Sequence, residues 1–236
     1  MTKLFLNFFI LSFAFSTLAL AQGGTLSGVI KFSGNAPKAK KIQMEADPIC
    51  LASHKDPVLT QALVLDKDNN LANVFIYIKS GLAQTAYPAP AEAVVIDQKG
   101  CNYSPRVIGV MVGQTVKILN PDGTLHNVHS KSKINPEFNA AMPNFRKEME
   151  KTFSQPEFMF PLRCDVHPWM IAWMSIMTHP FFNVSNTQGE FQIKDIPPGT
   201  YEIEAWHEKL GTQTAKVTIT DGKDQTVNFT FSPPKA

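Results

Sequence analysis

The chain has 236 residues, a formal net charge of +2 and a hydrophobic content of 44%. This apolar share supports a packed core and excludes a largely disordered chain. The sequence has no basic patch interleaved with aromatic residues, so we do not expect a nucleic acid as partner.

Residues 1–21 have the pattern of a secretory signal peptide. Lys3 gives the positive start, 4–20 is an apolar run, and 19–21 is a small-x-small cleavage site. We therefore expect an exported chain, periplasmic or secreted, with no stable membrane insertion after cleavage. A retained membrane anchor is the alternative. The remaining chain is long enough for one large all-β domain or two smaller ones.

Short β-branched and aromatic runs, separated by Gly, Pro, Asn and Asp, follow along most of the chain and are typical of β-strands. In the first half these runs are 25–32, 62–65, 73–78, 93–96, 106–112 and 114–119. Alternation over 201–206 and 226–231 directs one face of each strand toward a core. We expect an all-β protein without a long amphipathic helix. The segment 144–150 is the best candidate for a turn or two of helix.

The expected strand 114–119 is followed by a turn rich in Pro, Asp and Gly, which leads to His126. Such a turn ends a strand and lets the following residues face back across the sheet. His126 can therefore face the downstream loop 163–170, in which Cys164, His167 and Met170 offer a thiolate, an imidazole and a thioether. Soft sulfur and imidazole ligands with a weak axial Met are those of a mononuclear blue-copper site.

The alternative is a purely structural role, in which the buried cysteine packs as a small apolar side chain and the histidine forms hydrogen bonds within the fold. A Cys-x-x-His pattern on its own favours explanations other than a metal site. The joint spacing of HNVH at 126–129 and CDVHPWM at 164–170 favours copper.

These two motifs together resemble the cupredoxin family, and within it the amicyanin-like members, which share the short ligand loop. The resemblance spans about 94–178 and implies a Greek-key β-sandwich that holds one type 1 copper. The implied copper ligands are His126, Cys164, His167 and Met170.

The same resemblance implies roles for neighbouring residues. Asn127 would tie the two ligand loops together by hydrogen bonds, with its backbone N–H directed at the Cys164 sulfur. Asp165 departs from the amicyanin loop, and its carboxylate would either lower the copper potential or point to solvent.

His167 would reach the surface as the electron exit through an apolar patch that includes Pro168 and Trp169, and these three residues would contact the partner. Trp169 as an ordinary core residue is the alternative. The expected partner is a redox protein such as a c-type cytochrome or a periplasmic dehydrogenase.

A second resemblance lies near the C-terminus. Residues 189–193 and the Pro-Pro-Gly-Thr-Tyr turn at 197–201 resemble the carboxypeptidase regulatory-like family, whose small Ig-like β-sandwiches are grouped with carbohydrate-binding-like folds. Such sandwiches usually begin with a strand like 28–32, which here lies near the mature N-terminus.

Two domain arrangements are open. In the favoured one, the N-terminal strands of 22–85 complete the C-terminal sandwich of 179–236, and the cupredoxin domain of 90–178 is inserted between them. In the other, the N-terminal strands complete the cupredoxin sheets and the C-terminal part stands alone.

Cys50 and Cys101 remain once Cys164 is assigned to copper. In an exported protein an even remainder favours a disulfide between them, and two independent thiols are the alternative.

No pattern of nucleophilic catalysis is present, since the sequence has no Gly-x-Ser-x-Gly turn and its Cys-x-x-His belongs to the copper motif. We therefore expect an electron carrier and not an enzyme. The alternatives are a periplasmic copper carrier or storage protein, and a non-redox β-sandwich module in which copper is structural. A second metal site built from His129, His179 or His207 is less favoured than structural roles for these side chains.

Overall fold

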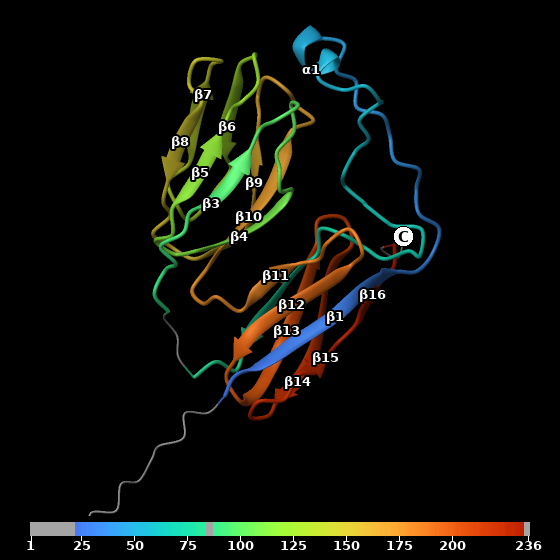
Figure 1. Cartoon of the computed structure of the whole chain (residues 1–236), viewed down its shortest axis with the longest axis vertical. Coiled ribbons are helices and arrows are strands. Elements are labelled where there is room, and N and C mark those ends of the chain that lie inside the picture. The colour runs from blue at the N-terminus through green and yellow to red at the C-terminus, as the bar shows by residue number, and fades with distance from the viewer. Residues whose placement is uncertain (1–21, 84–86, 234–236) are drawn as a thin grey trace, which may run out of the picture.

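The computed structural model describes residues 22–83 and 87–233, and the predicted signal peptide 1–21 lies outside this range. The described chain forms two β-sandwiches (Figure 1), so the predicted all-β fold class is confirmed. Within the described ranges, no helix has the length and apolar character needed to cross a bilayer.

The first sandwich carries the predicted copper ligands. One of its sheets has the order β4-β10-β9-β6-β7 and the other β3-β5-β8, and the pairs β3–β5 and β4–β10 are parallel. Apolar side chains such as Ile96, Val110, Ile118 and Leu162 fill the space between the sheets. The strands are β3 (Val94–Asp97), β4 (Val107–Met111), β5 (Val116–Leu119), β6 (His126–Ser130), β7 (Phe138–Met142), β8 (Glu148–Lys151), β9 (Glu157–Arg163) and β10 (Ile171–Met177).

The second sandwich is built from strands of both the N-terminal and the C-terminal part of the chain. In one sheet β1 pairs with β12, β15 and β16, and the other has the order β11-β2-β13-β14. Leu26 of β1 lies opposite Ile193 of β12, and the buried side chains of both belong to the core of this sandwich. The strands are β1 (Gly24–Phe32), β2 (Phe75–Ser80), β11 (Phe182–Val184), β12 (Glu190–Ile196), β13 (Gly199–His207), β14 (Gly211–Ile219), β15 (Gln225–Thr226) and β16 (Phe229–Phe231).

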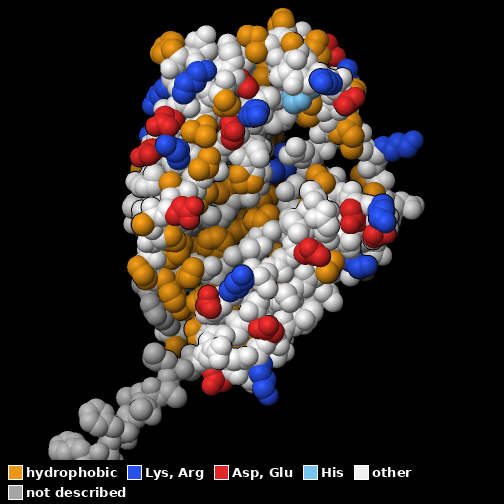
Figure 2. Space-filling model, in the orientation of Figure 1, with side chains coloured by type: hydrophobic (Ala, Val, Ile, Leu, Met, Phe, Trp, Pro, Cys, Tyr) orange, Lys and Arg blue, Asp and Glu red, His pale blue; other side chains and the backbone are white. Residues whose placement is uncertain are grey.

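The two sandwiches pack through aromatic side chains, and Figure 2 shows apolar side chains gathered along this junction. Phe75 and Phe182 stack with ring centroids 5.5 Å apart, next to Gly109 of β4. Trp173 of β10 and Trp206 of β13 meet edge to face at 5.4 Å. Gly109 fits here because it has no Cβ, and a Cβ at this position would lie 2.3 Å from the Phe182 ring.

Two local expectations are wrong, and one short helix was not expected. Residues 62–65 form no strand, because Leu65 makes only an isolated bridge to Leu71 and no continuous ladder forms there. Leu63 and Leu65 pack, partly buried, on the second core. Residues 144–150 form a turn and the start of β8 instead of a helix. The five-residue helix α1 (Pro48–Ala52) was not expected, and the Asp47 side chain caps it.

The substitution Gly109→Ala should destabilise the protein by about 1–3 kcal/mol, because overpacking forces buried side chains apart. The added Cβ would lie 2.3 Å from Phe182 and 2.8 Å from Phe75. Urea unfolding measures the loss. Gly123→Ala is the matched control, since its Cβ would have no neighbour nearer than 4.0 Å. Equal unfolding midpoints for the two variants would contradict the packing at the junction.

Candidate metal centre

The four predicted ligands lie at one end of the first sandwich. His126 is the first residue of β6, Cys164 directly follows β9, and Met170 directly precedes β10. Because β6 and β9 are antiparallel neighbours, the start of one lies beside the end of the other. The sheet therefore brings His126 to the loop that contains Cys164, His167 and Met170.

Three donor atoms converge at this end. The Nδ1 atoms of His126 and His167 are 3.0 Å apart, and the Cys164 Sγ lies 3.7 Å from Nδ1 of His167. Met170 belongs to the same buried cluster as Cys164, and the four side chains are at most 2% exposed. Two imidazole nitrogens and a sulfur in a buried site, with a thioether in the same cluster, make a donor set that fits copper.

Backbone hydrogen bonds close the ligand loop. The N–H of Cys164 donates to the carbonyl of Met170 at 3.2 Å, and the N–H of Met170 donates to the carbonyl of His167 at 2.9 Å. The loop is thereby held in one compact turn between β9 and β10, which limits how far its ligands can move.

Asn127 joins the two ligand segments. Its Oδ1 accepts a hydrogen bond of 2.7 Å from the N–H of Asp165, and a weaker one of 3.4 Å from the N–H of Val166. Its own backbone N–H donates to the Cys164 sulfur. Asn127 therefore fixes the position of the cysteine loop relative to β6.

Electrostatics favour a thiolate at Cys164. Burial alone would raise the pKa of this thiol, but hydrogen bonds from His126 and from backbone N–H groups lower it. Burial would likewise lower the pKa of His126, but its hydrogen bonds to Asp122 and Cys164 raise it to about 9. In the metal-free protein these shifts favour an imidazolium beside a thiolate.

Each of the two predicted ligand histidines also has a carboxylate at its outer nitrogen. Nε2 of His126 lies 2.9 Å from Oδ2 of Asp122, and Nε2 of His167 lies 3.1 Å from Oδ2 of Asp47. Neither carboxylate was predicted from the sequence. Asp122 lies only four residues before His126, and this spacing could have predicted their contact. No feature of the sequence around Asp47 predicts a contact with His167.

The prediction that His167 reaches the surface is wrong, since its side chain is 2% exposed. Asp47 and Cys50 cover its ring, and Sγ of Cys50 lies 3.5 Å from Nε2. Pro168 is exposed. Trp169 is half-buried, packs on the first core and donates from Nε1 to the carbonyl of Cys101 at 3.0 Å, so it has a structural contact there.

Cys50 and Cys101 form a disulfide across a sequence separation of 51 residues. Both residues are fully buried, and the bond connects α1 to the turn that follows β3. This turn is also held by Asp122, which accepts from the N–H groups of Gly100 and Cys101 at 3.0 and 2.8 Å. The disulfide is therefore part of the wall around the two histidines.

Asp165 lies at the surface and not against the ligands. Its half-exposed carboxylate lies 2.8 Å from Nδ1 of His129 and accepts from Nδ2 of Asn139 at 2.7 Å. Among the described residues, the side-chain groups able to hold a metal ion include none of the three extra histidines, His129, His179 and His207. His179 and His207 instead each accept a backbone N–H at 3.2 Å, as structural residues do.

The C-terminal part of the chain matches a known family. Residues 182–232, which contain β11 to β16, match the model of the carboxypeptidase regulatory-like domain. No curated protein sequence matches the chain.

Several solved structures of copper proteins are similar to part of the chain. A copper-containing nitrite reductase from Thermus scotoductus SA-01 is 19% identical over 41% of this chain and 25% of its own, with a TM-score of 0.34. A purple cupredoxin from Nitrosopumilus maritimus is 23% identical over 35% of this chain and 98% of its own, with a TM-score of 0.30. A copper(I) form of an amicyanin variant is 22% identical over 43% of this chain and 97% of its own, with a TM-score of 0.33. The matched part of this chain thus spans only a quarter of the nitrite reductase.

Replacing both Cys50 and Cys101 by Ser should lower the free energy of unfolding by about 4 kcal/mol, because the unfolded chain regains the entropy of a long loop. Urea unfolding of the metal-free protein measures this change. Reduction of the wild-type protein is the matched control and should give the same midpoint. A double variant as stable as the oxidised wild type would contradict a stabilising disulfide.

Proposed function

We propose that the protein is an exported type 1 copper protein that carries single electrons between redox partners and has no catalytic residues. The convergence of two imidazole Nδ1 atoms on Cys164 Sγ in a buried site carries this proposal. His126, Cys164 and His167 would hold the ion, with Met170 as the weak axial ligand. Bound copper would supply a one-electron couple.

The surroundings of the ligands support electron transfer. Hydrogen bonds from His126 and from backbone N–H groups lower the pKa of the Cys164 thiol, which favours the thiolate that binds copper. Asn127 and the backbone bonds within the cysteine loop keep the donors in place. A donor set held in this way changes little in geometry when the charge of the ion changes, which favours fast exchange of single electrons.

Burial of the ligands favours an electron carrier over a copper carrier. A protein that transfers its copper to an acceptor must let a ligand of the acceptor reach the ion. Here the four proposed ligands are at most 2% exposed, and α1 together with the disulfide covers one side of the site. Such a site favours retention of the metal, while electrons can still cross the thin layer that covers it.

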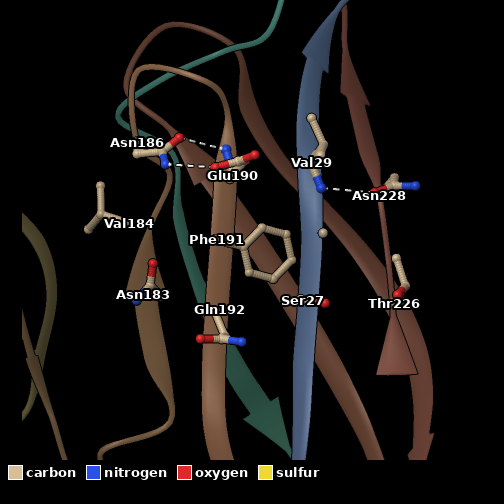
Figure 3. Close-up of a pocket in the computed structure, with 11 residues that line it drawn as sticks. Ser27, Val29, Asn183, Val184, Asn186, Glu190, Phe191, Gln192, Thr226 and Asn228 are labelled. Carbon is tan, nitrogen blue, oxygen red and sulfur yellow. Dashed lines mark hydrogen bonds between the residues drawn. The ribbon is translucent and has the colours of Figure 1, made fainter. Parts of the chain in front are cut away.

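The second sandwich gives little support for a sugar-binding module. An open groove crosses the sheet formed by β1 and β12, and polar side chains surround it (Figure 3). Asn186 and Asn228, however, already hold the backbone at Glu190 and Val29 by hydrogen bonds (Figure 3). Phe191 is 4% exposed, so its ring offers no free face for stacking on a sugar.

The exposed neighbours of the ligand histidines are the proposed partner surface. Leu125 and Val166, which directly precede His126 and His167, are 43% and 45% exposed. Pro168 is exposed beside them in the chain. Apolar side chains around a buried redox site suit a transient protein contact, and we propose a c-type cytochrome or a periplasmic dehydrogenase as partner. The disulfide suits such an oxidising compartment.

Cu(II) added to the metal-free protein should produce the intense visible absorption of a thiolate–copper bond. Cys164→Ser should abolish that absorption, because the charge-transfer donor is lost. Met170→Leu is the matched control, which should keep the colour and raise the reduction potential, since the weak axial ligand tunes the ion more than it anchors it. Strong colour in Cys164→Ser, or none in the wild type, would refute the proposed function.

Val166→Asp should slow electron exchange with a c-type cytochrome about tenfold, because the partner would have to bury an unpaired charge. Stopped-flow absorbance measures the rate. The control is Ile134→Asp, since Ile134 is 62% exposed and lies near Tyr77 at the junction of the sandwiches. Equal slowing by both substitutions would place the docking surface elsewhere.

A further inference from the structure

The two ligand histidines obtain their outer carboxylates in different ways. Asp122 reaches Nε2 of His126 from within the same turn, four residues away. Asp47 reaches Nε2 of His167 from 120 residues earlier in the chain, at the start of α1. The spacing of residues in the loop that contains His167 does not predict this second contact. The contact comes from the N-terminal segment of the chain.

We propose that Asp47 is a positioning residue for the metal centre, which holds His167 in the ring orientation and tautomer that direct Nδ1 at Cys164. This inference rests on the proposed copper site. A proton on Nε2, donated to the Asp47 carboxylate, leaves the lone pair of Nδ1 free for the ion. A carboxylate at the outer nitrogen also makes the imidazole a stronger donor, which favours the oxidised ion.

The two carboxylate oxygens of Asp47 have separate partners. Oδ1 caps α1 by accepting from the N–H groups of Ile49 and Cys50 at 2.9 and 3.1 Å. Oδ2 accepts from the Thr124 hydroxyl at 2.8 Å and from His167 at 3.1 Å. The cap thus fixes the carboxylate on the helix, and its second oxygen is left to face the site.

The disulfide fixes the helix itself. Cys50 lies three residues after Asp47 and is bonded to Cys101, whose backbone N–H is held by Asp122. Because Asp122 also contacts His126, the supports of the two histidines are joined to each other. Movement of α1 would therefore remove the Asp47 contact and uncover the His167 ring at the same time.

Asp47→Asn separates this role from helix capping. Asparagine caps a helix as well as aspartate does, so α1 should remain. Its side-chain NH2 group, however, would face the Nε2–H of His167 donor to donor. Thr124→Val is the matched control, because it removes the other contact of Oδ2 and leaves the histidine contact intact.

The first measurement uses the metal-free protein labelled with 15N-histidine. The wild type and Thr124→Val should show His167 protonated at Nε2, with a proton that exchanges slowly with water, and Asp47→Asn should lose this protection. The second measurement is titration with Cu(II) alone. Removing the hydrogen-bond partner of a metal-binding histidine typically weakens metal binding about 10- to 100-fold. Asp47→Asn should therefore lower the Cu(II) affinity by about this factor, and the reduction potential of the bound copper should rise.

Unchanged proton exchange and Cu(II) affinity in Asp47→Asn would overturn the proposal. If that variant does not fold, the wild type decides, since a His167 protonated at Nδ1 or an unprotected Nε2–H would overturn it equally. A wild type that binds no Cu(II) but shows the protected Nε2–H would refute the copper function and leave the Asp47 contact established. Failure of the proposed copper function can therefore be distinguished from failure of the proposal for Asp47.

Discussion

Two buried imidazoles with their Nδ1 atoms 3.0 Å apart impose the main constraint on this molecule. Each ring turns one nitrogen toward Cys164, and its other nitrogen needs a partner because an unpaired buried polar group is costly. Asp122 and Asp47 supply these partners. Three features of the fold support these two carboxylates: the turn after β3, the helix α1 and the disulfide.

The chain path explains how the second sandwich serves the first. After β1 the chain leaves the second sandwich, reaches α1 beside the site, and returns to form β2 (Figure 1). Both ends of this excursion are anchored, because β1 pairs with β12 and β2 pairs with β13. The aromatic junction then holds the two sandwiches together. Distant packing thus helps to fix the position of Asp47.

The covered histidine distinguishes this site from the one expected on resemblance alone. Where a ligand histidine is exposed, a partner can touch it directly. In the proposed electron carrier, a partner would instead approach the exposed side chains of Leu125 and Val166, because Asp47 and the disulfide cover His167. If that function holds, this cover determines where electrons enter and leave.

Local spacing and residue chemistry were enough to predict several features of the fold and the site. Period-2 alternation predicted the strands near the C-terminus, and motif spacing predicted that His126 and the cysteine loop meet. Only the tertiary structure gives the register of β1 against β12, the packing of 62–65 without a strand, and the burial of His167 under Asp47. These features depend on contacts between residues far apart in the chain, and no local pattern records which distant surface a side chain will meet.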